Sequence, residues 1–257
     1  MEYGIVQAPF IPVRKDPDST SEMTSQLLFG EIFEVLERNE QWLFVRNRFD
    51  GYEGWISPEL TSLFEDDTLR EYETMESSLV KKKFCSLRGA EGTLLIPTGS
   101  VLYYHAGDTR HIQCGKTYEF DMDPGETATD TLKALEDLKE ELRNVPYLWG
   151  GKSSYGTDCS GLVQTIFRIL EVPLFRDASQ QVGQGITVNM ITESQTGDLL
   201  FFDNDEGEIV HTGIIIGPGE ILHASGCVKV DAIDHQGIYS KQLGKYTHKL
   251  RVIKRVL

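Results

Sequence analysis

The chain has 257 residues, of which 40% are apolar and 25% are charged, the ordinary balance of a globular protein with ample material for a core. Its 25 basic residues stand against 40 acidic residues, which gives a net charge of −15. Because an acidic chain repels phosphate backbones and anionic membrane surfaces, this charge argues against nucleic-acid and membrane partners. Residues 1–125 hold 12 basic and 22 acidic residues, a net of −10, so the acid excess lies mainly in the N-terminal half.

The first 60 residues are predicted to form short strands. Two β-rich runs, 31–36 and 42–46, flank a polar turn and predict a hairpin. The glycines at 51 and 54 lie beside aromatic residues, as is typical of small barrels. A second β-rich stretch covers about 80–122, and within it residues 94–102 loosely repeat 27–33. This repeat predicts two related small barrels, which the acidic segment 61–78 would join.

The hydrophobic period changes after residue 125. Leucines at 132, 135, 138 and 142 form one helical stripe, with Thr129 or Asp130 as the expected N-cap, and a second apolar helix is predicted for about 159–170. Further strands are predicted at 198–202, 209–217, 220–224 and 250–256. Helices followed by an antiparallel sheet indicate an α+β domain. We therefore expect three parts: barrels at 1–62 and 63–125, and a larger domain at 126–257.

Cys159 is the residue most suggestive of chemistry. Asp158 is a good N-cap, which places Cys159 in the first turn of the second helix, where the helix dipole can lower a thiol pKa toward 7 or below. A thiolate is the nucleophilic form, so this position suits covalent catalysis. The four cysteines are sparse and contain no closely spaced pair, and we expect Cys85, Cys114 and Cys227 to be structural thiols rather than disulfide or zinc ligands.

Two histidines lie downstream of this cysteine. His211 and His223 belong to successive predicted strands joined by the turn at 217–219, so the two side chains are expected to lie side by side. A cysteine on a helix that faces a histidine on a strand, with a third polar group behind it, is the arrangement of a thiol hydrolase.

At this point the sequence resembles a known family. The runs YLWGG at 147–151, DCSGLVQ at 158–164, ASQQ at 178–181, GDLLFF at 197–202 and HTGI at 211–214 are similar to the NlpC/P60 peptidases. The resemblance implies a papain-like catalytic domain, with helices packed on an antiparallel sheet, and no metal or cofactor. It further implies that Cys159 is the nucleophile, that His211 is the general base and then the acid, and that His223 holds His211.

The resemblance extends to the substrate site and to the N-terminal half. It implies an oxyanion site made by the backbone N–H of Cys159 and the Tyr147 hydroxyl. The substrate-binding residues that it implies are Trp149, Asp158, Ser160 and Ser179. The runs SEMTSQLLFGE at 21–31 and DGYEGW at 50–55 are similar to the bacterial SH3 (SH3b) module of the YkfC-like branch, and both predicted barrels would be SH3b-like. Because a free amine needs an acceptor, Glu22 and Tyr52 are the candidates in the first barrel.

The resemblance to the YkfC-like branch implies a cysteine endopeptidase that cleaves the γ-D-glutamyl–diamino acid bond of peptidoglycan-derived peptides with a free N-terminal L-Ala, in murein peptide recycling. The sequence as given has neither a secretory signal nor an apolar run that could span a membrane, so a cytoplasmic location is expected, or secretion if the native N-terminus was trimmed.

Three alternatives stay open at this point: an NlpC/P60-type amidase or acyltransferase, a non-catalytic binding module, and a zinc hydrolase that uses His211, His223 and His235. The oligomeric state, and the choice between diaminopimelate and lysine in the substrate, are open as well.

Overall fold

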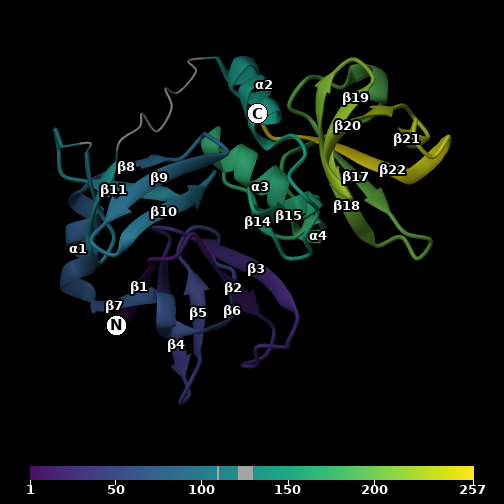
Figure 1. Ribbon diagram of the computed structural model, residues 1–257. Coiled ribbons are helices and arrows are strands. Elements are labelled where there is room, and N and C mark those ends of the chain that lie inside the picture. Colours follow the sequence, from purple (N-terminus) through teal and green to yellow (C-terminus); the bar gives the residue numbers. More distant parts are fainter. Residues whose placement is uncertain (109, 121–129) are drawn as a thin grey trace. The chain divides into compact units, whose positions relative to one another are not determined.

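The computed structural model describes residues 1–108, 110–120 and 130–257 (Figure 1). The chain divides into two compact units, Met1–Glu126 with Trp149–Ser154 and Thr127–Leu148 with Tyr155–Leu257. A six-residue segment shortly before Cys159 therefore belongs to the N-terminal unit. The finer division at residues 62 and 125 stays a prediction.

The N-terminal unit begins with a seven-stranded antiparallel sheet in the order β3-β2-β6-β5-β4-β1-β7. Its strands are β1 (Glu2–Val6), β2 (Phe10–Arg14), β3 (Met23–Leu28), β4 (Ile32–Arg38), β5 (Leu43–Asn47), β6 (Glu53–Ile56) and β7 (Thr61–Glu65), with a 3₁₀ turn at Pro58–Leu60. The predicted hairpin is confirmed, since β4 and β5 pair with Phe33 opposite Asn47.

A six-stranded sheet follows in the order β10-β9-β13-β12-β11-β8. Its strands are β8 (Glu76–Leu79), β9 (Phe84–Gly89), β10 (Gly92–Pro97), β11 (Val101–Tyr104), β12 (His111–Gln113) and β13 (Thr117–Phe120). The expectation that 61–78 is a plain linker is wrong. This segment contains β7, the helix α1 (Asp66–Thr74) and β8, because Leu69 and Tyr72 of α1 are buried and both strands find partners in the sheets.

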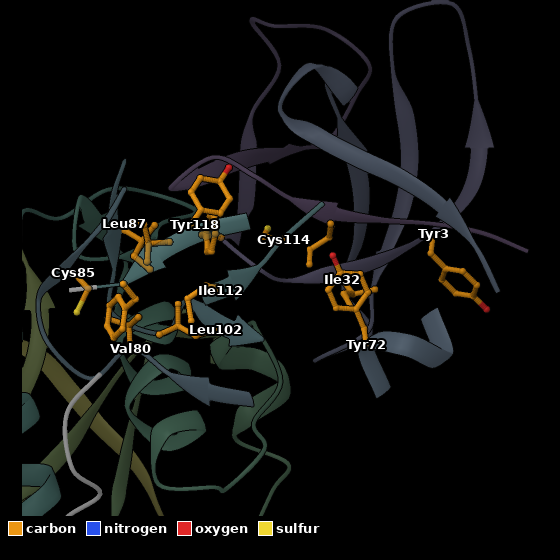
Figure 2. Close-up of a cluster of buried hydrophobic side chains, with 14 of the residues drawn as sticks. Tyr3, Ile32, Tyr72, Val80, Cys85, Leu87, Leu102, Ile112, Cys114 and Tyr118 are labelled. Atoms are coloured by element: carbon orange, nitrogen blue, oxygen red, sulfur yellow. The ribbon is translucent and has the colours of Figure 1, made fainter. Parts of the chain in front are cut away.

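One hydrophobic cluster joins these two sheets. Figure 2 shows Tyr3 and Ile32, from the first sheet, in one cluster with Leu87 and other residues of the second sheet and with Val80, which directly follows β8. The thiols of Cys85 and Cys114 are buried in this cluster. Burial raises the pKa of the Cys114 thiol far above its usual range, which keeps the thiol neutral and agrees with a structural role.

The segment Trp149–Ser154, which includes β14 (Lys152–Ser153), is held by buried polar contacts within the N-terminal unit. The Lys152 ammonium lies 3.0 Å from the Glu31 carboxylate, and both side chains are buried. The backbone N–H of Lys152 donates to the Gln26 side chain at 3.0 Å, and the Ser154 hydroxyl donates to that of Thr98 at 2.9 Å. A charge buried to this degree needs its partner, so the ion pair ties the segment to β4 and its neighbours.

In its described residues, 130–148 and 155–257, the C-terminal unit holds three helices and a seven-stranded antiparallel sheet in the order β16-β22-β17-β18-β19-β20-β21. Its helices are α2 (Thr131–Leu142), α3 (Cys159–Ile169) and α4 (Ala178–Gln181), with a 3₁₀ turn at Ile191–Glu193. The strands of this sheet are β16 (Ile186–Val188), β17 (Leu199–Asp203), β18 (Ile209–Gly217), β19 (Glu220–Ser225), β20 (Cys227–Ile233), β21 (Gly237–Ser240) and β22 (Lys245–Arg255). The short strand β15 (Gly156–Thr157) lies outside this sheet.

Both predicted helices of this unit are confirmed. Asp130 caps α2 by accepting from the backbone N–H of Leu132, whereas the other candidate cap, Thr129, lies outside the described residues. α3 is buried along almost its whole length and contacts β18 and β19 (Figure 1). The N-terminus of α3 is thereby placed against the strands that carry His211 and His223. Among the helices of the described ranges, none combines the length and the apolar character that crossing a membrane would require.

Candidate active site

Cys159 is the first residue of α3, as the sequence predicts. The Asp158 side chain caps the helix by accepting from the backbone N–H of Gly161 at 2.7 Å. Cys159 is 7% exposed, and the backbone N–H of Thr212 on β18 is hydrogen-bonded to its thiol. Because Thr212 follows His211 directly in the chain, this contact brings the thiol next to the strand that carries the predicted base.

A buried ion pair that sequence reasoning missed supports this turn of the helix. The Arg176 guanidinium donates to both carboxylate oxygens of Asp158, at 3.0 and 2.6 Å, and to the Ser160 hydroxyl at 3.0 Å. Arg176 is 1% exposed, and Asp158 and Ser160 are buried as well. The sequence shows only an arginine after the run VPLF at 172–175, with nothing to indicate its partner. The bidentate contact with Asp158 forms only in the tertiary fold.

The electrostatic surroundings of the thiol differ from the sequence-based expectation. Burial is the main cause that raises the pKa of Cys159, to about 11, and the negative charge of Asp158 adds to it. Hydrogen bonds from the backbone N–H groups of Thr212 and Ser160 offset only part of this rise. The lowered pKa expected from the helix dipole alone is therefore wrong, because loss of hydration outweighs the dipole at this site. The resting nucleophile is a neutral thiol.

The two predicted histidines lie together in the structure. His211 on β18 and His223 on β19 are both buried, and Nε2 of His211 lies 2.9 Å from Nδ1 of His223. Burial lowers the pKa of His211 well below 6.5 and lowers that of His223 to about 4. Both imidazoles are consequently neutral at pH 7, as a base that has yet to accept a proton must be.

Two further residues extend this pair, and neither was singled out in the sequence. Nε2 of His223 lies 3.1 Å from a carboxylate oxygen of Asp231 on β20. The His248 ring, on β22, stacks on the His211 ring with 4.1 Å between centroids and 22° between planes. The alternation of β20 could have suggested Asp231, since Lys229 lies opposite His223 and Asp231 follows on the same face. The sequence contains no comparable signal for His248.

Tyr147 lies five residues before β14 and forms an isolated parallel bridge with Thr157 of β15. Burial raises the pKa of its hydroxyl to about 12, and Cys159 and Asp158 add to this rise. The phenol is therefore protonated at neutral pH and can donate a hydrogen bond near the thiol, as the predicted oxyanion role requires.

The other predicted binding residues are distributed over both units. Ser179 is exposed on α4, which contacts α3 and β18. In the N-terminal unit, the indole N–H of Trp149 donates to the Glu22 carboxylate at 2.7 Å, and both residues are exposed. Tyr52 is partly buried against the core of the first sheet. The Trp149–Glu22 contact joins two residues that are 127 positions apart and that the sequence analysis selected separately.

The zinc alternative is not supported by this geometry. Ring nitrogens of His211 and His223 face each other, and no group of three or more His, Cys, Asp or Glu side chains in the described part of the chain is placed to hold a metal ion. His235 therefore does not complete a three-histidine site.

Comparison with known proteins identifies the class. Residues 144–248 match the NlpC/P60 family, and residues 13–59 match the bacterial dipeptidyl-peptidase SH3 domain. The chain thus contains an NlpC/P60 domain preceded by a bacterial SH3 domain, which confirms the resemblance drawn from the motifs. The NlpC/P60 match includes Cys159, His211 and His223.

Three relatives illustrate the similarity. The gamma-D-glutamyl-L-lysine dipeptidyl-peptidase of Bacillus subtilis (strain 168) is 27% identical over 219 residues, which cover 78% of this chain and 71% of that protein. Dipeptidyl-peptidase 6 of Lysinibacillus sphaericus is 29% identical over 258 residues, with 91% and 92% covered. The crystal structure of an NlpC/P60 family protein from Bacillus cereus ATCC 10987 has a TM-score of 0.83 at 19% identity and covers 99% of both chains, so it shares the fold.

Proposed function

We propose that this chain is a cysteine endopeptidase that hydrolyses the γ-D-glutamyl–diamino acid bond of cell-wall peptides bearing a free N-terminal L-Ala. The observation that carries the proposal is the juxtaposition of a thiol at the start of α3, the Thr212 N–H beside it, and the 2.9 Å contact between His211 and His223. The names of the relatives from Bacillus subtilis and Lysinibacillus sphaericus support a peptide substrate of this kind.

In the proposed reaction, the sulfur of Cys159 forms a bond with the γ-carbonyl carbon of D-Glu while its proton passes to His211. The oxyanion accepts hydrogen bonds from the Cys159 N–H and the Tyr147 hydroxyl. His211 then returns the proton to the leaving amine of the diamino acid as the C–N bond breaks. A water molecule, deprotonated by the same histidine, hydrolyses the thioester and releases the L-Ala-γ-D-Glu part.

Selection for a free amine is proposed to depend on the Trp149–Glu22 pair. The indole N–H holds one carboxylate oxygen of Glu22, which restricts the rotamers of the acid before substrate arrives. An oriented carboxylate suits an ammonium group, because a charge-assisted hydrogen bond is about twice as strong as a neutral one.

Further parts of the proposal concern architecture and setting. We propose that the second sheet is also SH3b-like and that the helices and sheet of the C-terminal unit are arranged as in papain-like enzymes; the contacts of α3 with β18 and β19 support this arrangement. The proposed setting is cytoplasmic recycling of murein peptides. The excess of acid in the N-terminal half agrees with barrels that contribute to specificity rather than bind anionic wall polymers.

The decisive experiment compares two tripeptides, L-Ala-γ-D-Glu-L-Lys and its N-acetylated form. The wild-type protein should cleave the free peptide, and acetylation should lower kcat/KM by about 10–100-fold, since it removes the ammonium group and a hydrogen bond to a charged group is worth about 1.5–3 kcal/mol. The Cys159→Ala variant should be inactive on both peptides. Equal cleavage of both peptides would refute amine selection, and substantial activity of Cys159→Ala would refute the thiol mechanism.

A further inference from the structure

The His211–His223 pair is one part of a longer hydrogen-bonded chain. His223 contacts His211 through Nδ1 at 2.9 Å and Asp231 through Nε2 at 3.1 Å. The same carboxylate oxygen of Asp231 lies 3.2 Å from the Lys229 ammonium. The register of β19 and β20 produces this arrangement, because His223 pairs with Lys229 and Asp231 lies two residues further on the same face.

The chemistry of the end group sets the direction of every hydrogen bond in this chain. An ionised carboxylate can only accept, so the proton of neutral His223 must be on Nε2, facing Asp231. Nδ1 of His223 is then a bare acceptor, and Nε2 of His211 must carry the proton that it donates there. A neutral imidazole has a single N–H, and therefore Nδ1 of His211 is left with a free lone pair.

We propose that Asp231 is a positioning residue that fixes the tautomers of both histidines and thereby makes Nδ1 of His211 the general base for Cys159. With the opposite polarity, His223 would donate from Nδ1 to Nε2 of His211. His211 would then carry its own proton on Nδ1 and could not accept the thiol proton at that atom. The catalytic meaning of this assignment rests on the proposed function, whereas the tautomers are a property of the resting protein.

The charges around the His211–His223 pair make a carboxylate next to His223 necessary. Among the described residues, the side chains outside the pair that act electrostatically on the two imidazoles are Lys229 and Asp231 from β20 and His248 from β22, and the titratable Cys159 thiol lies beside the strand of His211. Lys229 and His248 both disfavour a positive charge on His223, and Asp231 is the group that favours it. When His211 takes the thiol proton, the His211–His223 pair becomes positively charged. Among these groups, only Asp231 stabilises that charge.

The first test is a spectrum and needs no substrate. In protein labelled with ¹⁵N-histidine, long-range ¹H–¹⁵N correlations at pH 7.5 separate protonated from bare ring nitrogens. We expect Nε2–H forms for both His211 and His223, assigned from single His→Asn variants. A wild-type spectrum with His223 protonated on Nδ1 would overturn the proposal, whatever the protein hydrolyses.

The second test removes the acceptor without changing the shape of the side chain greatly. Asp231→Leu should lower kcat by about 10–100-fold with KM within about twofold, and should give a mixture of His223 tautomers. The matched control is Asp234→Leu, three residues along the chain. The Asp234 carboxylate accepts from the Tyr246 hydroxyl and the Gln236 backbone N–H, and no hydrogen bond joins it to His211 or His223 in the described part of the chain. This variant should retain the wild-type kcat and tautomers. Wild-type kcat and tautomers in a folded Asp231→Leu variant would overturn the proposal.

The two tests separate this inference from the proposed function. If the wild-type protein fails to cleave the tripeptide but shows the Nε2–H forms of both histidines, the function is wrong and the assignment of Asp231 as the tautomer-fixing group stands. If Asp231→Leu does not fold, the wild-type spectrum still decides, because a Nδ1–H form of His223 is incompatible with Asp231 as its acceptor.

Discussion

The protonation state of Cys159 leads to a prediction that distinguishes a resting neutral thiol–imidazole pair from a resting thiolate–imidazolium pair. Burial and the nearby charge of Asp158 raise the thiol pKa to about 11, and burial keeps His211 neutral. At pH 7 a thiol with this pKa is ionised in only about one molecule in 10⁴. Because alkylating reagents attack the thiolate, the rate constant for iodoacetamide at Cys159 should rise about tenfold per pH unit between pH 6 and pH 10.

The assay follows carboxamidomethylation of the peptide that contains Cys159 by mass spectrometry at several pH values. The Cys159→Ala variant measures the background from Cys227, which is half-buried. Cys85 and Cys114 are 1% and 0% exposed, against 7% for Cys159, and should react only on unfolding. A rate constant that is flat from pH 5 to pH 8 would mean that a thiolate–imidazolium pair exists in the resting protein. That result would refute the inference that burial raises the pKa of the Cys159 thiol, and with it the mechanism that starts from a neutral thiol and a neutral imidazole.

Three predictions concern stability, each measured by urea unfolding. Arg176→Met should cost about 3–5 kcal/mol because it leaves Asp158 as an unpaired buried charge, and the double variant with Asp158→Asn should lose less than the sum of the single variants; additive losses would contradict the coupling. His223 has a folded pKa of about 4, below its unfolded value near 6.5. Its contribution to the free energy of unfolding is therefore complete above about pH 6.5 and is lost as the pH falls toward 4. Between pH 7 and pH 4 the wild-type protein should therefore lose about 3 kcal/mol more than His223→Gln, and parallel pH profiles would count against this. Lys152→Met should destabilise the protein by about 3–5 kcal/mol by stranding Glu31, whereas Lys152→Met combined with Glu31→Gln should recover part of the loss; a single variant as stable as wild type would rule out the tie.

Local sequence signals predicted the elements that carry the chemistry. Asp158 before an apolar period of 3.6 marked the start of α3 at Cys159, since capping and hydrophobic periodicity depend on neighbours in the chain. The predicted strands around the turn at 217–219 correspond to β18 and β19, and the 2.9 Å contact between His211 and His223 confirms that these residues lie together. The acidic segment 61–78 was wrongly expected to be a linker, because its few apolar residues gain their burial only from distant strands.

Other properties depend on contacts between residues that are far apart in the sequence. The Asp158–Arg176 ion pair, the stacking of His248 on His211 and the Trp149–Glu22 hydrogen bond join positions 18, 37 and 127 residues apart. Nothing in local pattern or composition specifies such pairs. They form only when strands and helices pack, so the tertiary structure, and no local motif, selects these partners.

The sequence by itself determined which residues could do chemistry: a cysteine after a helix cap, two histidines across a turn, and an acidic N-terminal half with one glutamate suited to an amine. Only the tertiary structure decided their protonation states. Burial overrides the helix dipole and keeps the Cys159 thiol neutral, and the carboxylate of Asp231 sets the direction of the hydrogen bonds through His223. Desolvation and hydrogen-bond direction depend on the whole surroundings of a group, and for this reason they follow from the packed fold and not from the order of residues along the chain.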